Sequence, residues 1–189
     1  MTERREHDAA FTPLSMAEVR DELSLAFEAL TGRPPTAAEL ANLAAQVHLE
    51  TAGGQKMRGH NFGNLTGDYR GHFFPLSAPE HIHGEWKNVE QPYRWYPSPE
   101  SGALDYLEML QDRYPTAWRS LGKNPERFAA ALKHGEPYQY FTAPIDTYAA
   151  GLRDRYRGPV SAPTDASWLP LAVTLAAFAF VGYRLWGDK

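Results

Sequence analysis

Two helix-start motifs constrain the first third of the fold more than any other feature of the sequence. Ser15 is followed three residues later by Glu18, and Thr36 is followed at the same spacing by Glu39. In such a capping box each side chain accepts a hydrogen bond from the backbone N–H of the other residue, so a helix begins there. Gly32 and a Pro-Pro pair lie between the two motifs and are typical of a helix end and a turn. The chain is therefore expected to start with two consecutive helices joined by a short connection.

The second of these helices places a carboxylate on its apolar face. Leu40, Leu43, Val47 and Glu50 follow one another at steps of three, four and three residues, which puts them on one side of a helix. Near the last turn, partial burial and the negative end of the helix dipole both disfavour the charged carboxylate and raise its pKa. A raised pKa suits a general acid that works near neutral pH. From the spacing alone, a Glu50 that turns to solvent at the helix boundary is an equal alternative.

The residues that follow the second helix, as far as about residue 155, also predict a mostly helical domain. Residues 59–91 are rich in Gly, Asn, His and aromatic residues, lack helical periodicity, and are expected to form loops and a short hairpin. Ser98 or Ser101 begins a further helix, and shorter helices are expected at about 125–133 and 145–155. With 43% hydrophobic residues among 189, the chain can build an ordinary core. The expected fold class is α+β, mostly α.

Charge and cysteine content exclude several classes of protein. The net charge of -4 provides no overall basic field for nucleic acid, so no nucleic-acid partner is expected. Without cysteine, disulfides and thiolate metal sites are impossible. His81 and His83 would share a face of a strand and, with His60 or His72, could bind zinc, but neither a carboxylate spacing nor a helical His pair supports this. No metal and no cofactor is predicted.

An apolar stretch of 19 residues, 168–186, lies near the end of the sequence and contains a single charge, Arg184. As a helix rising about 1.5 Å per residue it would be about 28 Å long, close to the thickness of a bilayer core. Trp168 at one end and Tyr183 and Trp186 at the other are placed as interfacial anchors. The stretch is therefore predicted to be a single transmembrane helix, with a buried core helix as the alternative.

A series of short motifs runs between residues 36 and 156. They read Glu-Thr-Ala-Gly-Gly at 50–54, His-Asn-Phe-Gly-Asn-Leu at 60–65, Ala-Pro-Glu-His-Ile-His-Gly-Glu-Trp at 78–86, Tyr-Arg-Trp-Tyr-Pro-Ser-Pro-Glu-Ser at 93–101 and Tyr-Phe-Thr-Ala-Pro at 140–144. In this order they resemble the motifs of the bacterial glucosaminidase family of peptidoglycan hydrolases, glycoside hydrolase family 73. The sequence departs from the family by lacking one residue of an Asn-Asn-Leu-Phe run and by having Ala143 where the family has Asp.

This resemblance implies a lysozyme-like fold, in which a helical lobe and a small β-hairpin lobe flank a groove for a glycan strand. It implies Glu50 as the general acid, Glu80 on the hairpin as the second carboxylate, and Tyr140 as a catalytic residue that positions the substrate or stabilises an intermediate. Other residues of the motifs would shape the groove or stack on sugars. The predicted substrate-binding set is Asn61, Phe62, Asn64, Trp86 and Tyr96.

The residues themselves leave the identity of the second carboxylate open. Glycoside hydrolysis usually uses two carboxylates, and their separation sets the stereochemical course. Asp68, Glu85 and Glu90 lie in the same region as Glu80 and are alternatives to it. A substrate with a 2-acetamido group can also supply the nucleophile itself, in which case one protein acid is sufficient.

Taken together, these features predict a membrane-tethered peptidoglycan hydrolase. Its expected parts are a mobile arm (1–14), a lysozyme-like domain (15–157), a linker (158–167) and the transmembrane helix (168–186). It would cut β-1,4 bonds between N-acetylated sugars of the bacterial wall, as an endo-β-N-acetylglucosaminidase or a muramidase. A lytic transglycosylase, or a non-catalytic glycan-binding or structural membrane protein on the same fold, is the alternative.

The expected location follows from the two ends of the sequence. The first ten residues are polar and charged and do not resemble a signal peptide. Arg153, Arg155 and Arg157 precede the apolar stretch, which by the positive-inside tendency places the domain on the cytoplasmic side. A phage virion with an internal membrane, which delivers the enzyme to the host wall, or a bacterial inner membrane with the domain exported would each reconcile this with a wall substrate. The expected partners are peptidoglycan glycan strands and a lipid bilayer.

Overall fold

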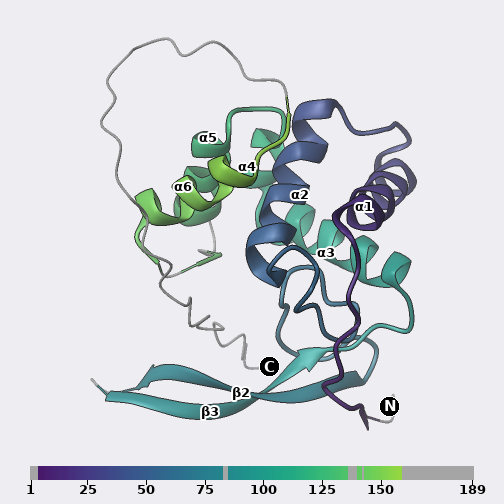
Figure 1. Cartoon of the computed structure of the whole chain (residues 1–189), viewed down its shortest axis with the longest axis vertical. Helices are drawn as coiled ribbons and strands as arrows, with labels where there is room; N and C mark the ends of the chain where they lie inside the picture. The colour runs from purple at the N-terminus through teal and green to yellow at the C-terminus, as the bar shows by residue number, and fades with distance from the viewer. Residues whose placement is uncertain (1–3, 83–84, 136–139, 142, 159–189) are drawn as a thin grey trace.

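The computed structural model describes residues 4–82, 85–135, 140–141 and 143–158, and it shows a body of helices with a long β-hairpin at one end (Figure 1). In this part of the chain, helix α2 packs against both α1 and α6, and α3 packs against α1. The helices are α1 (Met16–Thr31), α2 (Ala37–Thr51), α3 (Pro99–Arg113), α4 (Pro115–Ser120), α5 (Pro125–His134) and α6 (Ile145–Arg155). The strands are β1 (Arg5–Glu6), β2 (His72–Ile82) and β3 (Glu85–Arg94), in the sheet order β1-β2-β3.

Both predicted capping boxes are confirmed. The Ser15 hydroxyl accepts from the Glu18 backbone at 3.2 Å, and the Glu18 carboxylate accepts from the Ser15 backbone at 2.7 Å. The corresponding distances in the Thr36–Glu39 box are 3.3 and 2.7 Å. Gly32 ends α1 in the left-handed region at φ 75°, which an L side chain adopts only at a cost. Local sequence signals therefore determine where the first two helices begin and where the first one ends.

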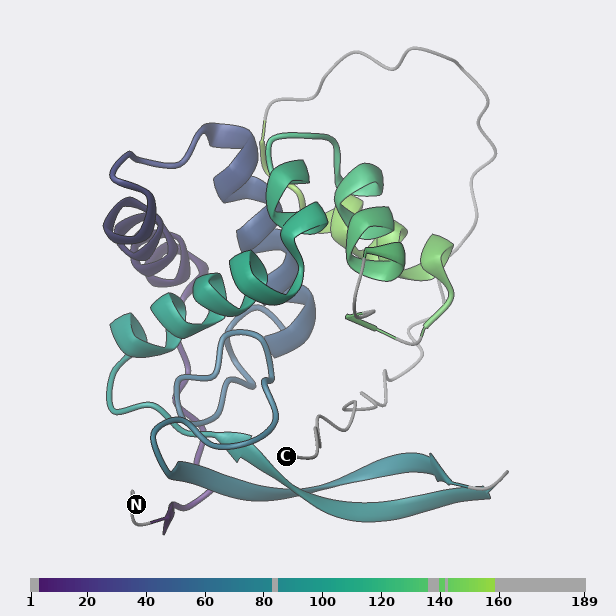
Figure 2. The same ribbon diagram turned by 180° about the vertical axis from the view of Figure 1, so that it is seen from behind.

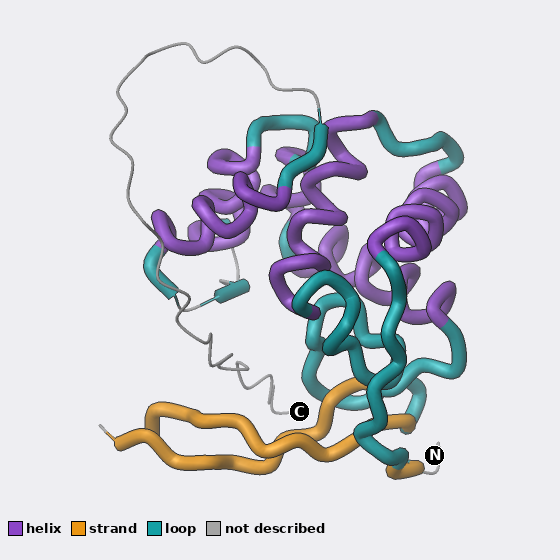
Figure 3. The backbone as a smooth tube through the Cα atoms, in the orientation of Figure 1, coloured by secondary structure: helices purple, strands orange, loops and turns teal. Residues whose placement is uncertain are grey.

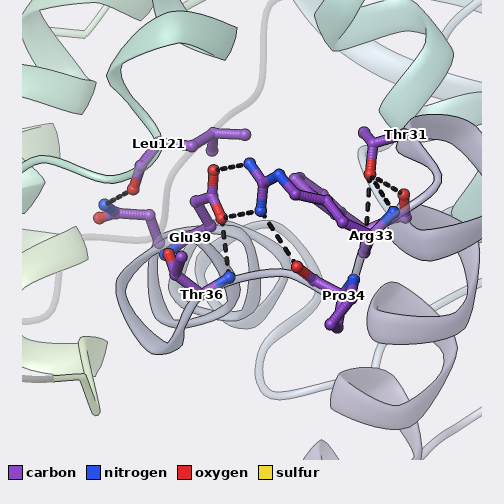
Figure 4. Close-up of polar contacts among 8 residues, drawn as sticks. Thr31, Arg33, Pro34, Thr36, Glu39 and Leu121 are labelled. Carbon is purple, nitrogen blue, oxygen red and sulfur yellow. Dashed lines mark hydrogen bonds and ion pairs between the residues drawn. The ribbon is translucent and has the colours of Figure 1, made fainter.

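A bidentate ion pair stabilises the connection between α1 and α2 (Figure 4). The two guanidinium nitrogens of Arg33 lie 2.7 and 2.9 Å from the two carboxylate oxygens of Glu39. Arg33 also donates to the Pro34 carbonyl, so the turn residues are tied to the start of α2. The contact with Arg33 is the main cause that lowers the pKa of Glu39, to about 2. Glu39 therefore stays ionised at neutral pH and serves both the cap and the ion pair.

One hydrophobic core lies between the helices. Leu43 and Val47 of the predicted α2 stripe are fully buried in it, and Leu40 packs against its edge. Trp118 is partly buried against this core and stacks on Phe27, with 5.3 Å between the ring centroids. The largest fully buried side chains are Tyr96, Tyr106, Phe27, Phe62, Phe74, Phe128, Leu23, Leu43, Met57, Leu107, Leu110 and Leu121.

The β-hairpin is longer than the short hairpin that the sequence predicts. Strands β2 and β3 pair antiparallel from Phe73↔Arg94 at the base to Ile82↔Glu85 near the tip. The views in Figures 1, 2 and 3 show this twisted ribbon at one end of the helical body. Prolines obscure the strand pattern in the sequence, and Pro75 lies directly opposite Pro92. A two-stranded ribbon accepts proline because each strand has an edge that needs no ladder hydrogen bond.

The segment before α1 differs from the mobile arm that the sequence predicts. From residue 4 onward it is described and docked: β1 pairs in parallel with β2, with Arg5 opposite His72. Further along, the Thr12 backbone donates to the Met57 carbonyl at 2.9 Å, and the His7 ring stacks on Trp95 with 3.7 Å between centroids. The polar composition of this segment suggested mobility, but backbone pairing and ring stacking, which join residues distant in sequence, hold it on the domain.

The predicted linker and transmembrane helix lie outside the described residues, apart from Gly158. Across the portion of the chain that is described, none of the helices combines the length and the apolar character needed to cross a membrane.

Candidate active site

Glu50 lies in the last turn of α2, where the chain leaves the helix through three consecutive left-handed residues. Ala52, Gly53 and Gly54 have φ values of 50°, 72° and 82°. A Cβ on Gly54 would lie 2.1 Å from the Leu14 carbonyl oxygen, so only glycine allows the N-terminal segment to pass this closely. The Thr51 hydroxyl donates to the Val47 carbonyl and accepts from the Gly54 backbone, which holds the end of the helix in place.

The Glu50 carboxyl is buried, although the residue as a whole is partly exposed. Its Oε1 accepts a 2.9 Å hydrogen bond from the Tyr148 hydroxyl of α6. Its Oε2 is buried and has no hydrogen-bond partner among the described residues. Burial raises the pKa of Glu50 to about 8, and the hydrogen bond from Tyr148 opposes this rise. Glu50 is therefore mostly protonated at neutral pH, as a general acid must be.

Three tyrosines surround this carboxyl. Tyr106 on α3, Tyr140 before α6 and Tyr148 on α6 all have pKa values raised well above the ordinary value, first by burial and then by the negative charge of ionised Glu50. An electrostatic effect of this kind requires that the phenols lie near the carboxylate. The Tyr140 hydroxyl itself donates to the Gly63 carbonyl at 3.1 Å. The structure thus brings the predicted Tyr140 and Glu50 into one site.

The loop after α2 supports the acid from its other side. Asn64 donates from its side chain to the Glu50 backbone carbonyl at 2.6 Å, although it has a left-handed φ of 50°. Asn61 bonds the Leu65 backbone in both directions and also donates to the Arg94 carbonyl at the end of β3. These contacts link the end of α2, the loop and the base of the hairpin.

Several predicted substrate-binding residues are buried. Asn61 is 1% exposed, and Phe62 and Tyr96 are 0% exposed. The Tyr96 hydroxyl donates to Asp105 on α3 at 2.6 Å, and Phe62 belongs to the hydrophobic core. Their burial favours a supporting role, in which they hold the loop and the end of β3 in place, over the direct contact with a glycan that the sequence predicts.

Glu80 and Trp86 lie in the outer part of the hairpin. Their backbones pair with Lys87 and His81, respectively, while the orientation of their side chains lies outside what the structure describes. Along the ribbon, the Glu80 pair is seven residues from Phe73↔Arg94 at the base, or about 23 Å at 3.3 Å per residue. Their predicted roles therefore remain predictions. Among the described residues, no three His, Asp or Glu side chains come close enough together to hold a metal ion.

The sequence did not single out Tyr148, Tyr106 or the backbone contact of Asn64. Tyr148 and Leu152 are buried one turn apart on α6, a spacing that marks the face of this helix turned toward the protein interior. That pattern could have indicated burial of Tyr148. It could not have indicated the contact with Glu50, because the two residues are 98 positions apart in the chain.

Solved structures of bacterial cell-wall hydrolases share this fold. The catalytic domain of the autolysin Auto from Listeria monocytogenes matches with a TM-score of 0.56 and 22% sequence identity, over 77% of this chain and 84% of that one. A mutant peptidoglycan hydrolase from Sphingomonas sp. A1 matches with a TM-score of 0.52 and 24% identity, over 76% and 86%. An N-acetylmuramoyl-L-alanine amidase from Staphylococcus aureus matches with a TM-score of 0.53 and 17% identity, over 80% of this chain but 46% of that one.

No protein-family model and no curated protein sequence matches the chain. At the identities found, the structural likeness shows a common fold, which is mostly helical with a small sheet and fits the lysozyme-like class. The predicted α+β, mostly helical fold class is confirmed, and the resemblance to peptidoglycan hydrolases is confirmed at the level of the fold.

Proposed function

We propose that this protein is a peptidoglycan hydrolase that cleaves β-1,4 bonds between N-acetylated sugars, with Glu50 as its general acid. The observation that carries the proposal is the buried Glu50 carboxyl, whose pKa of about 8 leaves it protonated at neutral pH. The Oε2 atom, which has no hydrogen-bond partner within the described part of the chain, adds support, because a buried polar atom without a partner is uncommon and often belongs to a working site. The fold shared with bacterial wall hydrolases adds independent support.

In the proposed reaction, Glu50 donates its proton to the bridging oxygen as the glycosidic bond breaks. Positive charge then develops on the sugar carbon and must be met by a nucleophile. Burial is the main cause of the raised pKa of Glu50, and no charge of another described carboxylate contributes to it. A second carboxylate close to Glu50 would raise the pKa further. The side chain of Glu80 lies outside the described residues, so the nucleophile is either Glu80, a water that it activates, or the 2-acetamido group of the substrate.

We propose roles in the same reaction for three other predicted site residues. Tyr140 would position the sugar beside Glu50, since its phenol is close enough to feel the Glu50 charge. Asn64 would hold the end of α2, and with it Glu50, in place beside the glycan through its hydrogen bond to the Glu50 backbone carbonyl. Trp86 would stack on a sugar ring from the hairpin, as aromatic side chains commonly do with flat apolar faces.

The test is clearing of purified cell wall by the full chain. Wild type should clear the wall, and Glu50→Gln, which keeps the shape but cannot donate the carboxylic proton, should lose activity by at least about 100-fold. Glu28→Gln is the matched control, because Glu28 is an exposed glutamate on α1, and it should clear as wild type does. No clearing by wild type would instead support a non-catalytic glycan-binding protein, and equal clearing by Glu50→Gln would show that Glu50 is not the general acid.

Analysis of the digested cell wall determines which glycosidic bond is cut and whether it is cut by hydrolysis or by transglycosylation. A new reducing end on N-acetylglucosamine indicates a glucosaminidase, and one on N-acetylmuramic acid indicates a muramidase. An anhydro product would indicate a lytic transglycosylase. The 2-acetamido group can serve as the nucleophile on either sugar, so we propose the glucosaminidase outcome on the sequence resemblance alone.

We also propose that residues 168–186 tether the domain to a bilayer, either the internal membrane of a phage virion or a bacterial inner membrane. The apolar length and the terminal aromatic residues of this stretch support the proposal. Membrane fractionation of cells that express the full chain tests the tether, and protease accessibility of the domain tests its orientation. Recovery of the full chain in the soluble fraction would contradict the tether.

A further inference from the structure

Tyr148 on α6 distinguishes the two oxygens of the Glu50 carboxyl. The residue is 3% exposed, and its hydroxyl oxygen lies 2.9 Å from Oε1 of Glu50. The other carboxyl oxygen, Oε2, is buried and makes no hydrogen bond within the described part of the chain. One oxygen of the acid therefore has a phenol as its partner, and the other has none among the described residues.

A ring stack and helix packing hold the Tyr148 phenol against the acid. The Tyr148 ring stacks on the Phe141 ring, with 3.8 Å between the centroids and 10° between the planes. Lys133 on α5 donates from Nζ to the backbone carbonyls of Phe141 and Ala143, at 3.0 and 3.1 Å, and so ties this segment to α5. Helix α6 itself packs against α2. A buried ring fixed in this way has little freedom to turn its hydroxyl away from Glu50.

The other two phenols near the carboxyl bond elsewhere. The Tyr140 hydroxyl donates to the Gly63 carbonyl at 3.1 Å, and the Tyr106 hydroxyl donates to a side-chain amide of α2 at 2.6 Å. All three phenols feel the charge of Glu50, and their raised pKa values keep them neutral over the range in which Glu50 titrates. Among the described side chains, Tyr148 is thus the one that bonds the carboxyl.

From this geometry we propose that Tyr148 is a positioning residue for the general acid: its hydrogen bond makes Oε1 the carbonyl oxygen of protonated Glu50 and places the catalytic proton on Oε2. The inference rests on the proposed role of Glu50. A protonated carboxyl has one O–H donor and one carbonyl acceptor. If the proton lay on Oε1, the buried Oε2 would be a carbonyl oxygen without a donor, and the hydrogen of the phenol would lose its acceptor. With the proton on Oε2, the phenol keeps its acceptor, and a single O–H is left for the substrate.

This arrangement also favours the product of the proton transfer. The proton passes from Oε2 to the bridging oxygen, that oxygen keeps the electron pair of the breaking carbon–oxygen bond, and Glu50 is left as a carboxylate. Tyr148 still donates to Oε1, and a hydrogen bond to an ionised acceptor is stronger than one to a neutral acceptor. The phenol therefore directs the proton in the acid and stabilises the carboxylate that remains.

Infrared spectroscopy of the full chain tests the position of the proton. A protonated carboxyl band at neutral pH belongs to Glu50 if it is missing from Glu50→Gln. In wild type we expect its C=O stretch at the lowered frequency of a hydrogen-bonded carbonyl. In Tyr148→Phe, which keeps the ring and removes the hydroxyl, we expect the higher frequency of a free carbonyl. Tyr106→Phe and Tyr140→Phe are matched controls that should leave the band in place, because each removes a phenol oxygen that bonds elsewhere.

A free carbonyl frequency in wild type, or a band that Tyr148→Phe does not move, would overturn the proposal. If Tyr148→Phe does not fold, the wild-type frequency decides. Phe141→Leu, which removes the stacked ring, should then move the band in the same direction by a smaller amount.

Titration and kinetics separate positioning from packing. In Tyr148→Phe the midpoint of the Glu50 titration, measured by ¹³C NMR of its carboxyl carbon, should rise by on the order of one pH unit, because the carboxylate loses its donor. The kcat of wall hydrolysis should fall by on the order of 10-fold. The KM should change little, because Tyr148 is buried and offers the glycan almost no surface. A variant that only loosened the packing would lower the rate without raising the midpoint.

The infrared and NMR measurements do not depend on activity, so the two proposals can fail separately. If both measurements give the expected result and no glycan is cut, the role of Tyr148 stands and the proposed function fails. If glycan is cut but the band does not move in Tyr148→Phe, the function stands and the role of Tyr148 fails. Absence of a protonated carboxyl band at neutral pH would contradict both.

Discussion

Glu50 is a carboxylic acid that the fold keeps in an apolar setting at a cost in stability. Its pKa of about 8 in the folded protein lies above the ordinary value of 4.5, and burial is the main cause. An unfolded chain releases this proton at lower pH, so the contribution of Glu50 to stability is fully present below about pH 4.5 and is lost as the pH rises to about 8. Active sites often store destabilisation in this way.

This cost predicts that Glu50→Gln, while inactive, stabilises the protein in alkaline solution. The quantity to compare is the free energy of unfolding of the variant minus that of wild type. This difference should be larger at pH 8.5 than at pH 4.5 by a few kcal/mol, because each unit by which a pKa is shifted corresponds to about 1.4 kcal/mol. Urea unfolding of both proteins at the two pH values measures this difference. A difference that does not depend on pH would show that Glu50 titrates normally.

The residue scale also shows how far the sequence could predict the site. Periodicity on α2 placed Glu50 on an apolar face, and the structure buries its carboxyl there. The Tyr148 contact was beyond prediction because it forms only when α6 packs against α2. Asn61 and Phe62 lie in the loop that follows α2, and their burial could not be read from a short motif.

At the scale of elements, a partly buried ion pair joins the base of the hairpin to the helical body. Arg94 at the end of β3 lies 2.6 Å from Asp105 on α3, and Tyr96 donates to the same carboxylate oxygen. The side chains of the pair are 19% and 16% exposed. A Cβ on Gly102, also in α3, would lie 2.0 Å from the His60 carbonyl oxygen, so α3 and the loop behind Glu50 are in close backbone contact. The helix α3 thus fixes both the hairpin base and the loop.

We predict that Asp105→Ala destabilises the protein by about 3–5 kcal/mol, because it leaves the Arg94 guanidinium largely buried without its carboxylate. The control is Asp68→Asn, which breaks the exposed 3.6 Å pair with Arg4, whose side chains are 60% and 39% exposed. It should change stability by less than about 0.5 kcal/mol. Thermal or urea unfolding of the two variants checks the contrast. Equal effects would mean that the Arg94 pair is not what holds the hairpin base.

The elements that could be predicted are those with local signals. Capping side chains located α1 and α2, and the pattern at 145–155 located α6. The length of the hairpin and the docking of β1 could not be predicted in the same way. Strand pairing is non-local, the prolines of β2 and β3 weaken the strand pattern, and β1 joins the sheet through residues 67 positions apart in the chain, such as Arg5 and His72.

At the scale of the whole molecule, the helical body and the hairpin meet at the end of α2 that carries Glu50. Asn61 and Asn64 connect that end to the loop and to β3, and the N-terminal segment covers the turn at Gly54. The arrangement places a protonated acid beside the loop that connects the helical body to the hairpin. The apolar stretch that follows would keep this site near a bilayer if the proposed tether is correct.

The most direct test of this account compares two titrations of the wild-type full chain. One is the ¹³C NMR titration of the Glu50 carboxyl, and the other is the alkaline limb of the rate of cell-wall hydrolysis. We predict that both have a midpoint near pH 8, the pKa that burial gives to Glu50. A carboxyl that titrates near its ordinary value of 4.5, or a rate that does not fall as Glu50 loses its proton, would contradict the assignment of Glu50 as the buried general acid.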